Sequence, residues 1–310
     1  MNGIIVIDKP QGMTSHDVVS FLRRKTGVRR IGHTGTLDPM ATGVLPVFIG
    51  KATRLIEYAG APGSPEAKLY RCEIKFGLET DTQDIWGKTL ATNGDLPDAP
   101  SIMRVLKGFE GPGRQRPPMY SAVRAGGRRL YDYARKGEEV DESLVKERDI
   151  YIKHIDVKQI DEVAGGAVFD VLCSKGVYIR TICADAGRLL GCGAVMSGLR
   201  RLSSDGFSAA DAVPLDVLRS GEAPIPPLLP MDEPLGWMRR VDLTESGSLS
   251  FAQGRPVLYE ALYRGLSEAT EEETRHLVRV YGPGGFLGVG KVSPGETPQS
   301  AVIKPEKVLA

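Results

Sequence analysis

The segment YRCEIKFG, at residues 70 to 77, constrains the fold of this chain most, because apolar and charged side chains alternate along it. Successive side chains of a β-strand point to opposite faces of the sheet, so this strand has one apolar face and one face that carries Arg71, Glu73 and Lys75. A sheet with one buried and one solvated face is typically antiparallel. We therefore expect this half-buried strand in an antiparallel sheet.

Further strands and helices are expected on both sides of this strand. Thr14 or Ser15 is suited to begin a helix, and Gly27 is suited to end it. Another helix is expected from about Tyr178. The other expected elements are strands at residues 4–8, 44–49, 148–157 and 167–174, and a short helix at residues 52–59.

Two stretches interrupt this pattern and indicate how the chain is divided. Residues 110–148 are punctuated by glycine and proline, and hold seven basic side chains against one acidic between positions 114 and 136. This composition favours a surface insertion over core. Six prolines between residues 213 and 236 mark the expected domain boundary. Beyond it, apolar runs flank GPGG, which predicts a hairpin in a small all-β module.

The charges are unevenly distributed, although the formal net charge of the chain is only +1. Residues 23–33 hold five basic side chains and no acidic one, while acidic side chains gather at residues 267–274. A block of like charges is usually a solvated face, but two basic blocks with interleaved tyrosines favour nucleic-acid binding.

A lone carboxylate stands in the glycine-rich segment IGHTGTLDPM, residues 31 to 40. Gly35 and Pro39 are turn-forming residues, so Asp38 can simply be the first half of an Asp-Pro turn. A rigidly held and ionised carboxylate can instead act as a nucleophile toward a sugar carbon or an activated double bond. The segment by itself leaves both interpretations open.

Three other side chains bear on this choice. Arg180 falls in the first turn of an expected helix, where the helix dipole is unfavourable for a cation, so it needs a compensating charge. A buried arginine beside Asp38 would lower the pKa of that carboxylate and fix its direction, although a surface ion pair is the ordinary role of an arginine. Tyr70 is equally typical of a core aromatic residue, and His33 of a hydrogen-bonded loop residue.

The sequence offers no motif for a metal, a nucleotide cofactor or a membrane span. The cysteines form no CxxC pair and no histidine stands at metal-ligand spacing from them, so we expect reduced thiols in or near the core at Cys72, Cys173, Cys183 and Cys192. Walker, GxSxG and dinucleotide fingerprints are missing, and no apolar run approaches about 20 residues. We expect a cytoplasmic protein without metal or cofactor.

Six stretches, in this order, resemble the bacterial tRNA pseudouridine synthase B family: GIIVIDKPQGMTSHDVV, RRIGHTGTLDPMATGVLPVFIGKATRL, YRCEIKFGLETDTQDIWG, PPMYSAVRAGGRRLYDYARKG, CSKGVYIRTICADAG and GLRRLSSDGF. The GHTGTLDPMATGVL block is highly specific. From about residue 238 the chain resembles a PUA RNA-binding domain through FAQGRPV, GPGGFLGVGKV and AVIKPEKVL.

The resemblance implies a fold and an activity. The implied fold is α+β, with a mixed, largely antiparallel sheet flanked by helices and a small C-terminal all-β PUA-like domain. Residues 1–235 would form the catalytic domain, with the basic insertion at about 110–148, and residues 238–310 the PUA-like domain. The implied activity is isomerisation of uridine-55 in the TΨC arm of tRNA, without metal or cofactor. We expect a monomer that needs no protein partner.

The resemblance also implies roles for single residues. Asp38 would be the nucleophile, Arg180 its ion-pair partner, and Tyr70 would pack against the base and accept the proton from C5. His33 would help to extrude the nucleotide. The pocket and the RNA contacts would involve Leu199, Lys9, Pro10, Arg128 and Arg129.

These residues are also compatible with other functions. Guide-RNA-dependent synthases share the GHTGTLDP block and also carry a PUA domain, although the YSAVRAGGRRLYDYARKG stretch favours the stand-alone branch. A non-catalytic protein that binds or folds tRNA is a second alternative. An unrelated carboxylate hydrolase is disfavoured, because no second carboxylate stands out as an acid partner. Attack at C1′, attack at C6 and elimination to a glycal are all compatible with Asp38.

Overall fold

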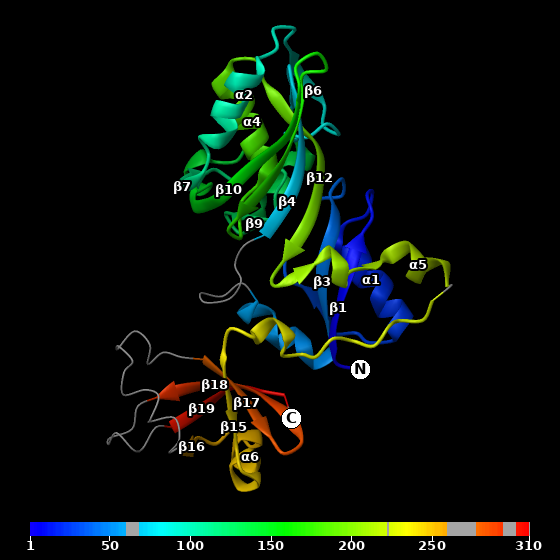
Figure 1. Ribbon diagram of the computed structural model, residues 1–310, viewed down its shortest axis with the longest axis vertical. Coiled ribbons are helices and arrows are strands. Elements are labelled where there is room, and N and C mark those ends of the chain that lie inside the picture. Colours follow the sequence, from blue (N-terminus) through cyan, green and yellow to red (C-terminus); the bar gives the residue numbers. More distant parts are fainter. Residues whose placement is uncertain (60–67, 222, 259–276, 294–301, 310) are drawn as a thin grey trace.

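The computed structural model describes residues 1–59, 68–221, 223–258, 277–293 and 302–309. Most of the described chain forms one large sheet with its helices, and a smaller sheet lies at the other end of the long axis (Figure 1). This agrees with the expected α+β class. The acidic run at residues 267–274 lies outside the described residues.

The large sheet holds ten strands within the described residues, in the order β14-β1-β3-β12-β4-β11-β10-β7, with β2 beside β3 and β13 beside β12. Neighbours are antiparallel except β1 with β14 and β3 with β12. The bounds are β1 Gly3–Lys9, β2 Ile31–His33, β3 Thr42–Ile49, β4 Lys68–Phe76, β7 Gly111–Gln115, β10 Arg148–Asp161, β11 Gly166–Cys173, β12 Ala194–Ser204, β13 Phe207–Ser208 and β14 Val213–Pro214.

The helices and the remaining short elements connect these strands. The bounds are α1 Ser15–Thr26, α2 Ala99–Lys107, α3 Leu130–Lys136, α4 Ile179–Leu190 and α5 Leu215–Ser220, with 3-10 helices η1 Gly50–Tyr58, η2 Glu142–Leu144, η3 Ala209–Asp211 and η4 Glu233–Leu235. Two small hairpins complete the set, β5 Leu78–Thr80 with β6 Thr89–Thr92, and β8 Arg124–Ala125 with β9 Arg128–Arg129. The short helix expected at residues 52–59 is present as the 3-10 helix η1, whereas α2 was not predicted from the sequence.

The two halves of the large sheet meet where β3 and β12 run parallel over only two residue pairs, one of which is Gly43 with Arg201. Gly43 has φ of 100°, and a Cβ there would lie 2.2 Å from the backbone oxygen of Arg201. Only glycine tolerates this conformation and this approach. The segment that carries Asp38 ends at the start of β3, so it lies at this junction.

Local sequence signals set the ends of α1. The Thr14 hydroxyl accepts from the backbone N–H of Asp17, whose carboxylate accepts from the backbone of Thr14 in return. This capping box satisfies two N–H groups that a helix end would leave unpaired. Gly27 ends the helix in the left-handed conformation. Both ends agree with the expectation from the sequence.

The main core lies between the large sheet and its helices. The strand at YRCEIKFG is β4, and its even-numbered side chains are buried as the alternation predicts. The same core takes in the apolar sides of α2 and α4, which lie together along one side of the sheet in Figure 1. The four cysteines are free and buried, as expected.

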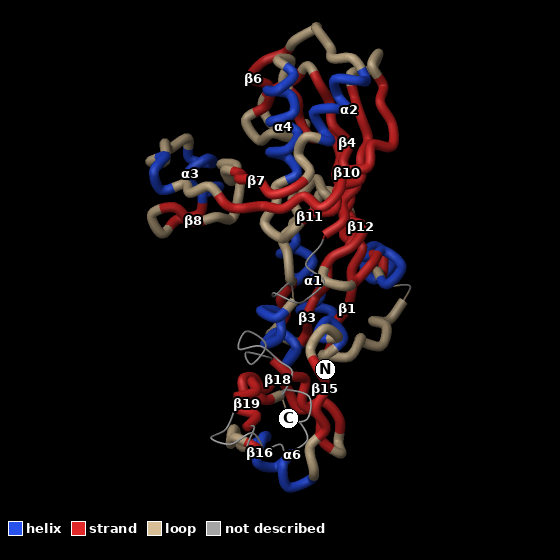
Figure 2. Tube along the Cα trace, turned by 60° about the vertical axis from the view of Figure 1, so that its left-hand side comes forward, coloured by secondary structure: helices blue, strands red, loops and turns tan. Residues whose placement is uncertain are grey.

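The insertion at residues 110–148 is only in part a projection. Its first strand, β7, pairs with β10 and so belongs to the large sheet. The rest projects to one side of the sheet and contains β8, β9 and α3 (Figure 2). A small cluster of Ala125, Leu130 and Val145 packs inside it. The projection therefore has a core of its own that is too small to be read from the sequence pattern.

The proline-rich segment between residues 213 and 236 packs against the large sheet. β14 pairs with β1, and Ile4 and Leu229 exchange two backbone hydrogen bonds. After it comes a five-stranded sheet in the order β15-β17-β18-β19-β16, with α6 beside it. The bounds are β15 Arg239–Asp242, α6 Glu245–Ala252, β16 Val257–Leu258, β17 Leu277–Gly282, β18 Gly285–Ser293 and β19 Val302–Val308. The predicted hairpin around GPGG is β17 with β18.

The small sheet is fastened to η1 of the large region. The Nζ of Lys51 donates to the backbone oxygen of Leu309 at 3.0 Å, and Lys307 pairs with Glu57 at 2.7 Å. Side chains of both sheets, such as Phe48 and Val289, belong to one buried cluster. No described helix is long and apolar enough to cross a membrane.

Candidate active site

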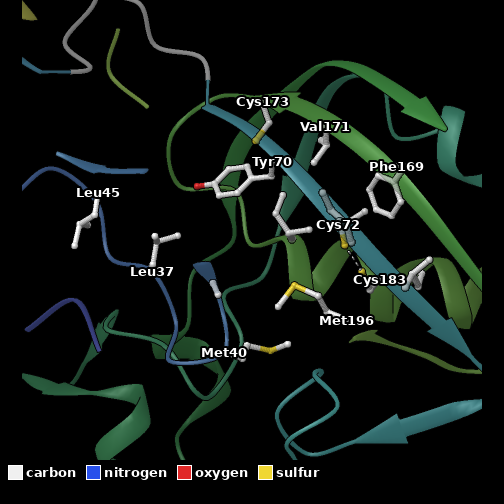
Figure 3. Close-up of a cluster of buried hydrophobic side chains, with 14 of the residues drawn as sticks. Leu37, Met40, Leu45, Tyr70, Cys72, Phe169, Val171, Cys173, Cys183 and Met196 are labelled. Carbon is white, nitrogen blue, oxygen red and sulfur yellow. Dashed lines mark hydrogen bonds between the residues drawn. The ribbon is translucent and has the colours of Figure 1, made fainter. Parts of the chain in front are cut away.

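The segment that carries Asp38 is held by contacts from elsewhere in the chain. The Ser15 hydroxyl, at the start of α1, accepts from the backbone N–H of Leu37 at 2.8 Å and lies 3.2 Å from the oxygen of the same residue. Leu37 and Met40 are buried on either side of Asp38, and Figure 3 shows both among the core side chains. The loop is therefore more than a surface Asp-Pro turn, because two buried anchors fix the carboxylate between them.

Lys9 lies under this loop and is fully buried. Its Nζ donates to the backbone oxygens of Pro10, Met13 and Pro39, at 2.9, 2.6 and 3.4 Å. Burial lowers the pKa of Lys9 to about 8, and the nearby Asp38 carboxylate opposes that shift. Lys9 thus ties the turn after β1 to the turn after Asp38, and brings a positive charge near the carboxylate.

Arg180 is the cation that contacts Asp38 directly. Its Nε lies 2.9 Å from Oδ2 of Asp38, and its side chain is only 4% exposed while that of Asp38 is 35% exposed. Nη1 donates to the backbone oxygen of Thr82 and Nη2 to that of Tyr120, both at 2.8 Å. The guanidinium is therefore fixed by three separate segments. Carboxylates from outside the helix supply the negative charge that compensates Arg180 in the first turn of α4.

Asp84 is a second carboxylate at Arg180, and the sequence analysis missed it. Its Oδ2 lies 3.8 Å from Nη1 of Arg180. Its other oxygen accepts from the Thr82 hydroxyl at 2.8 Å and from the backbone N–H of Trp86 at 3.0 Å. The available signal was the TDTQD run that begins at the last residue of β5, since aspartate and threonine in such a run form side-chain-stabilised turns. That signal indicates a turn and does not indicate its partner.

The surroundings raise the pKa of Asp38 above its ordinary value. Burial is the largest cause, Arg180 opposes it, and Asp84 adds to it. The Arg180 contact alone would have lowered this pKa, as predicted from the sequence, but the partial burial of the carboxylate outweighs that contact. The Asp38 carboxylate is thus fixed in direction, and it is harder to ionise than a solvated carboxylate.

Tyr70 projects from β4 into the same core, with its hydroxyl toward the side of Figure 3 where Leu37 and Leu45 lie. Its partner on β12 in the antiparallel register is Arg201, so the two side chains are neighbours on one face. Burial raises the pKa of Tyr70, and Arg201 is the strongest opposing influence. The phenol is therefore protonated at neutral pH and lies beside a cation.

Arg201 is fully buried and was also missed by the sequence analysis. Its Nε donates to the backbone oxygen of Val44 at 2.7 Å and its Nη2 to that of Gly35 at 3.1 Å. A Cβ at Gly35 would lie 2.6 Å from Nζ of Lys68 and 3.2 Å from Nη1 of Arg201, so these two side-chain ends would have to move if a larger residue stood there. The signal was the LRRL run, where strand alternation places Arg201 on the same face as Leu199.

The other predicted residues lie at different distances from this centre. His33 ends β2, and burial together with the nearby cations lowers its pKa to about 4, so it is neutral at neutral pH. Leu199 is partly buried on β12 against the main core, opposite Cys72. Pro10 adjoins Lys9, which donates to its backbone oxygen.

Arg128 and Arg129 lie in the projecting part of the insertion and contact none of these residues in the structure. Arg128 pairs with Glu138 at 2.7 Å, and its guanidinium carbon lies 4.1 Å from the ring centre of Tyr133. Arg129 donates to the Tyr131 hydroxyl at 2.6 Å. These side chains form an exposed basic and aromatic surface, separate from the Asp38 centre.

Among the described residues, no group of three or more histidine, cysteine, aspartate or glutamate side chains is arranged to hold a metal ion. Cys72 and Cys183 are neighbours with their sulfurs 3.5 Å apart, deep in the core (Figure 3). Burial raises the pKa of the Cys72 thiol, so these cysteines are packing residues.

Solved structures share this fold along almost the whole chain. A chain from a Cbf5-Nop10-Gar1 complex aligns with a TM-score of 0.70 at 25% identity, over 99% of this chain and 85% of that one. A chain from an H/ACA ribonucleoprotein bound to a substrate RNA that contains 2′-deoxyuridine aligns with a TM-score of 0.67 at 22% identity, over 99% of this chain and 85% of that one, which supports the fold alone.

Sequence relatives narrow this to one family. Residues 23–179 match the N-terminal domain of the TruB family of pseudouridylate synthases, and residues 180–235 match the tRNA pseudouridylate synthase B C-terminal domain. The chain is 41% identical over 292 residues to tRNA pseudouridine synthase B of Alkaliphilus oremlandii, covering 94% of this chain and 93% of that relative. It is 46% identical over 254 residues to the same enzyme of Symbiobacterium thermophilum, covering 79% of each. The chain belongs to the TruB family, as its motifs predict.

Proposed function

We propose that this protein converts uridine-55 in the TΨC arm of tRNA to pseudouridine, with Asp38 as the nucleophile. The observation that carries the proposal is the Asp38–Arg180 ion pair at 2.9 Å, held at a junction of the large sheet in a chain of the TruB family. The chain matches relatives named tRNA pseudouridine synthase B over most of their length, and this match supports tRNA as the substrate.

The reaction cuts the bond from N1 to C1′, rotates the uracil and joins C5 to C1′, with no net redox change. Ionised Asp38 supplies the electron pair that forms a bond with the nucleotide and receives it back when pseudouridine is released. Arg180 fixes the direction of that carboxylate. Attack at C1′ or C6 and elimination to a glycal all use the same group.

The proton balance of the reaction gives Tyr70 a task. C5 must lose a proton and N1 must gain one. Because burial keeps Tyr70 protonated, its hydroxyl can give a proton to N1 and take one from C5, so the phenol ends unchanged. Arg201, its neighbour across the strands, stabilises the phenolate in between.

Access to the base requires extrusion of the nucleotide from the RNA loop, which costs a few kcal/mol that stacking and backbone contacts must offset. We assign extrusion to His33 and the pocket wall to Leu199, with Lys9 and Pro10 supporting the loop. Arg128 and Arg129 would contact RNA phosphates.

The division of labour between the two sheets is part of the same proposal. Residues 1–235 would form the catalytic domain, including the insertion, and residues 238–310 a PUA-like RNA-binding domain. A cytoplasmic location and a monomer without protein partners remain predictions.

The test uses an unmodified tRNA transcript labelled with tritium at C5 of uridine. Tritium release and transcript binding are measured for the wild type, for Asp38→Asn, and for Asp95→Asn, which changes an exposed aspartate in the loop after β6. We expect all three to bind, and release from the wild type and Asp95→Asn only. Release by Asp38→Asn would refute the nucleophile assignment.

A guide-dependent reaction is the second candidate, because solved chains that match this fold come from Cbf5 complexes. The same assay separates the two, since it contains no other RNA or protein. Binding without release by the wild type would favour a guide-dependent enzyme or a protein that only binds or folds tRNA. Addition of a guide RNA and its proteins would then distinguish these.

A further inference from the structure

Two large apolar side chains are exposed next to each other in the loop between β5 and β6. Ile85 is 46% exposed and Trp86 is 54% exposed. Exposed single apolar residues are ordinary, so exposure alone assigns no role. The role of Trp86 follows from how firmly its loop is held and from where that loop lies.

The backbone around Trp86 is fixed on both sides. Its N–H donates to Oδ1 of Asp84, and the next residue, Gly87, donates its N–H to the Asp84 oxygen at 3.1 Å. The N–H of Ile85 donates to Met196 of β12 at 3.0 Å, which bonds the loop to the large sheet. An aromatic ring on so rigid a loop loses little freedom when it binds a partner, so it is suited to contact another flat group.

The same loop reaches the candidate active site. Asp84, two residues before Trp86, is the carboxylate 3.8 Å from Arg180, which in turn contacts Asp38. The start of the same loop meets the insertion, since the Tyr120 hydroxyl lies 3.4 Å from Oδ2 of Asp81. Trp86 is therefore an exposed ring on the loop whose earlier residues, Asp81 and Asp84, contact the insertion and Arg180.

We propose that Trp86 stacks on a nucleobase of the substrate RNA that neighbours the extruded uridine. Extrusion of one nucleotide leaves its neighbours without a stacking partner, and an aromatic side chain supplies the missing surface. The insertion that this loop contacts at Tyr120 also carries Arg128 and Arg129 in its projecting part, and these charges suit a phosphate backbone. The inference rests on the proposed function and adds a contact that positions the RNA.

The test follows tryptophan fluorescence, because the chain has two tryptophans and the second is Trp237, packed against another buried cluster. An unmodified TΨC-arm RNA hairpin is titrated into the wild type, Trp86→Phe, Trp86→Ala and Leu189→Ala, which shortens an exposed leucine at the far end of α4. Binding is also measured by RNA mobility shift, and tritium release is measured in parallel.

We expect the hairpin to quench emission of the wild type and of Leu189→Ala but not of Trp86→Phe. Phenylalanine still stacks, so Trp86→Phe should bind within about threefold of the wild type, whereas Trp86→Ala should bind roughly tenfold more weakly. Equal quenching in Trp86→Phe, or full affinity in Trp86→Ala, overturns the inference. Self-association of the wild type that Trp86→Ala abolishes would also overturn it, because a second copy would then cover the ring.

These outcomes separate the two proposals. Quenching of the wild type and weaker binding by Trp86→Ala, but no tritium release from the wild type, would support the stacking contact and refute the catalytic function. Normal tritium release from the wild type without any quenching that depends on Trp86 would support the catalytic function and refute the stacking contact.

Discussion

Arginine serves two opposite purposes in this molecule, at the Asp38 centre and in the projecting insertion. Arg180 is 4% exposed and is fixed by an aspartate and by two backbone oxygens from separate segments. Arg128 is 41% exposed and its partners, Glu138 and Tyr133, lie within ten residues of it. The first is bound by the fold, and the second is bound only by its neighbours in sequence.

The difference indicates what each region can do. A buried guanidinium that is held by distant segments cannot move without disturbing the fold. It is therefore suited to orient a reacting group. An exposed ion pair contributes little stability and is screened by salt, so it can be exchanged for an RNA phosphate at small cost. Substitutions in the two regions should therefore differ in kind as well as in size.

The largest effect is expected for Arg180→Met. This change leaves the buried Asp84 without its cation and two backbone oxygens without donors, so we expect a loss of about 3 kcal/mol in the free energy of unfolding. Tritium release should fall by about 100-fold or more, because Asp38 loses its fixed direction. Thermal unfolding and single-turnover release measure the two effects. A fully active Arg180→Met would show that the ion pair has no catalytic role.

The next effect is expected for charge reversal in the insertion. The double variant Arg128→Glu and Arg129→Glu should weaken tRNA binding and reduce the slope of log affinity against log salt by about 1.4 to 1.8, if each side chain neutralises one phosphate. Arg188→Glu, at an exposed arginine of α4, is the matched control and should leave the slope unchanged. An unchanged slope in the double variant would remove the insertion from the RNA interface.

A smaller effect is expected in the pH dependence of Asp84→Asn. Activity requires ionised Asp38, so it falls as the pH drops through the pKa of that group. Asp84 raises this pKa, so its removal should lower the pKa and move the acid limb of the pH profile to lower pH. The measurement is kcat/KM against pH, compared with the wild type after scaling to each maximum. An acid limb that stays in place would mean that Asp84 does not act on Asp38.

The smallest effect is expected for Glu138→Gln. This change frees Arg128 from its exposed partner and removes a negative charge beside the proposed phosphate contact. Exposed pairs are worth about 0.2 to 1 kcal/mol, so tRNA affinity should rise by no more than about fivefold and stability should hardly change. The matched control is Asp185→Asn, which removes the exposed partner of Arg188 on α4 and should leave the tRNA affinity unaffected. A large loss of stability would show that the insertion is held by this pair.

Local patterns in the sequence determined much of the fold. The alternation in β4, the start of α1 at Thr14 or Ser15 and its end at Gly27, and the hairpin around GPGG depend on neighbouring residues, and the structure agrees with each. The motif blocks predicted the family. The prediction that Asp38 and Arg180 lie together rested on these blocks, since nothing in the spacing of two residues so far apart reveals their contact.

Only the tertiary structure decided which side chains surround that pair. Asp84 and Arg201 carry no local signal of their partners, because their contacts join strands and loops that are far apart in sequence. The upward shift of the Asp38 pKa was likewise decided by burial, which depends on how the whole junction packs. Backbone propensity and periodicity act over a few residues and are readable in one dimension, whereas desolvation and charge pairing are set by distances that exist only after folding.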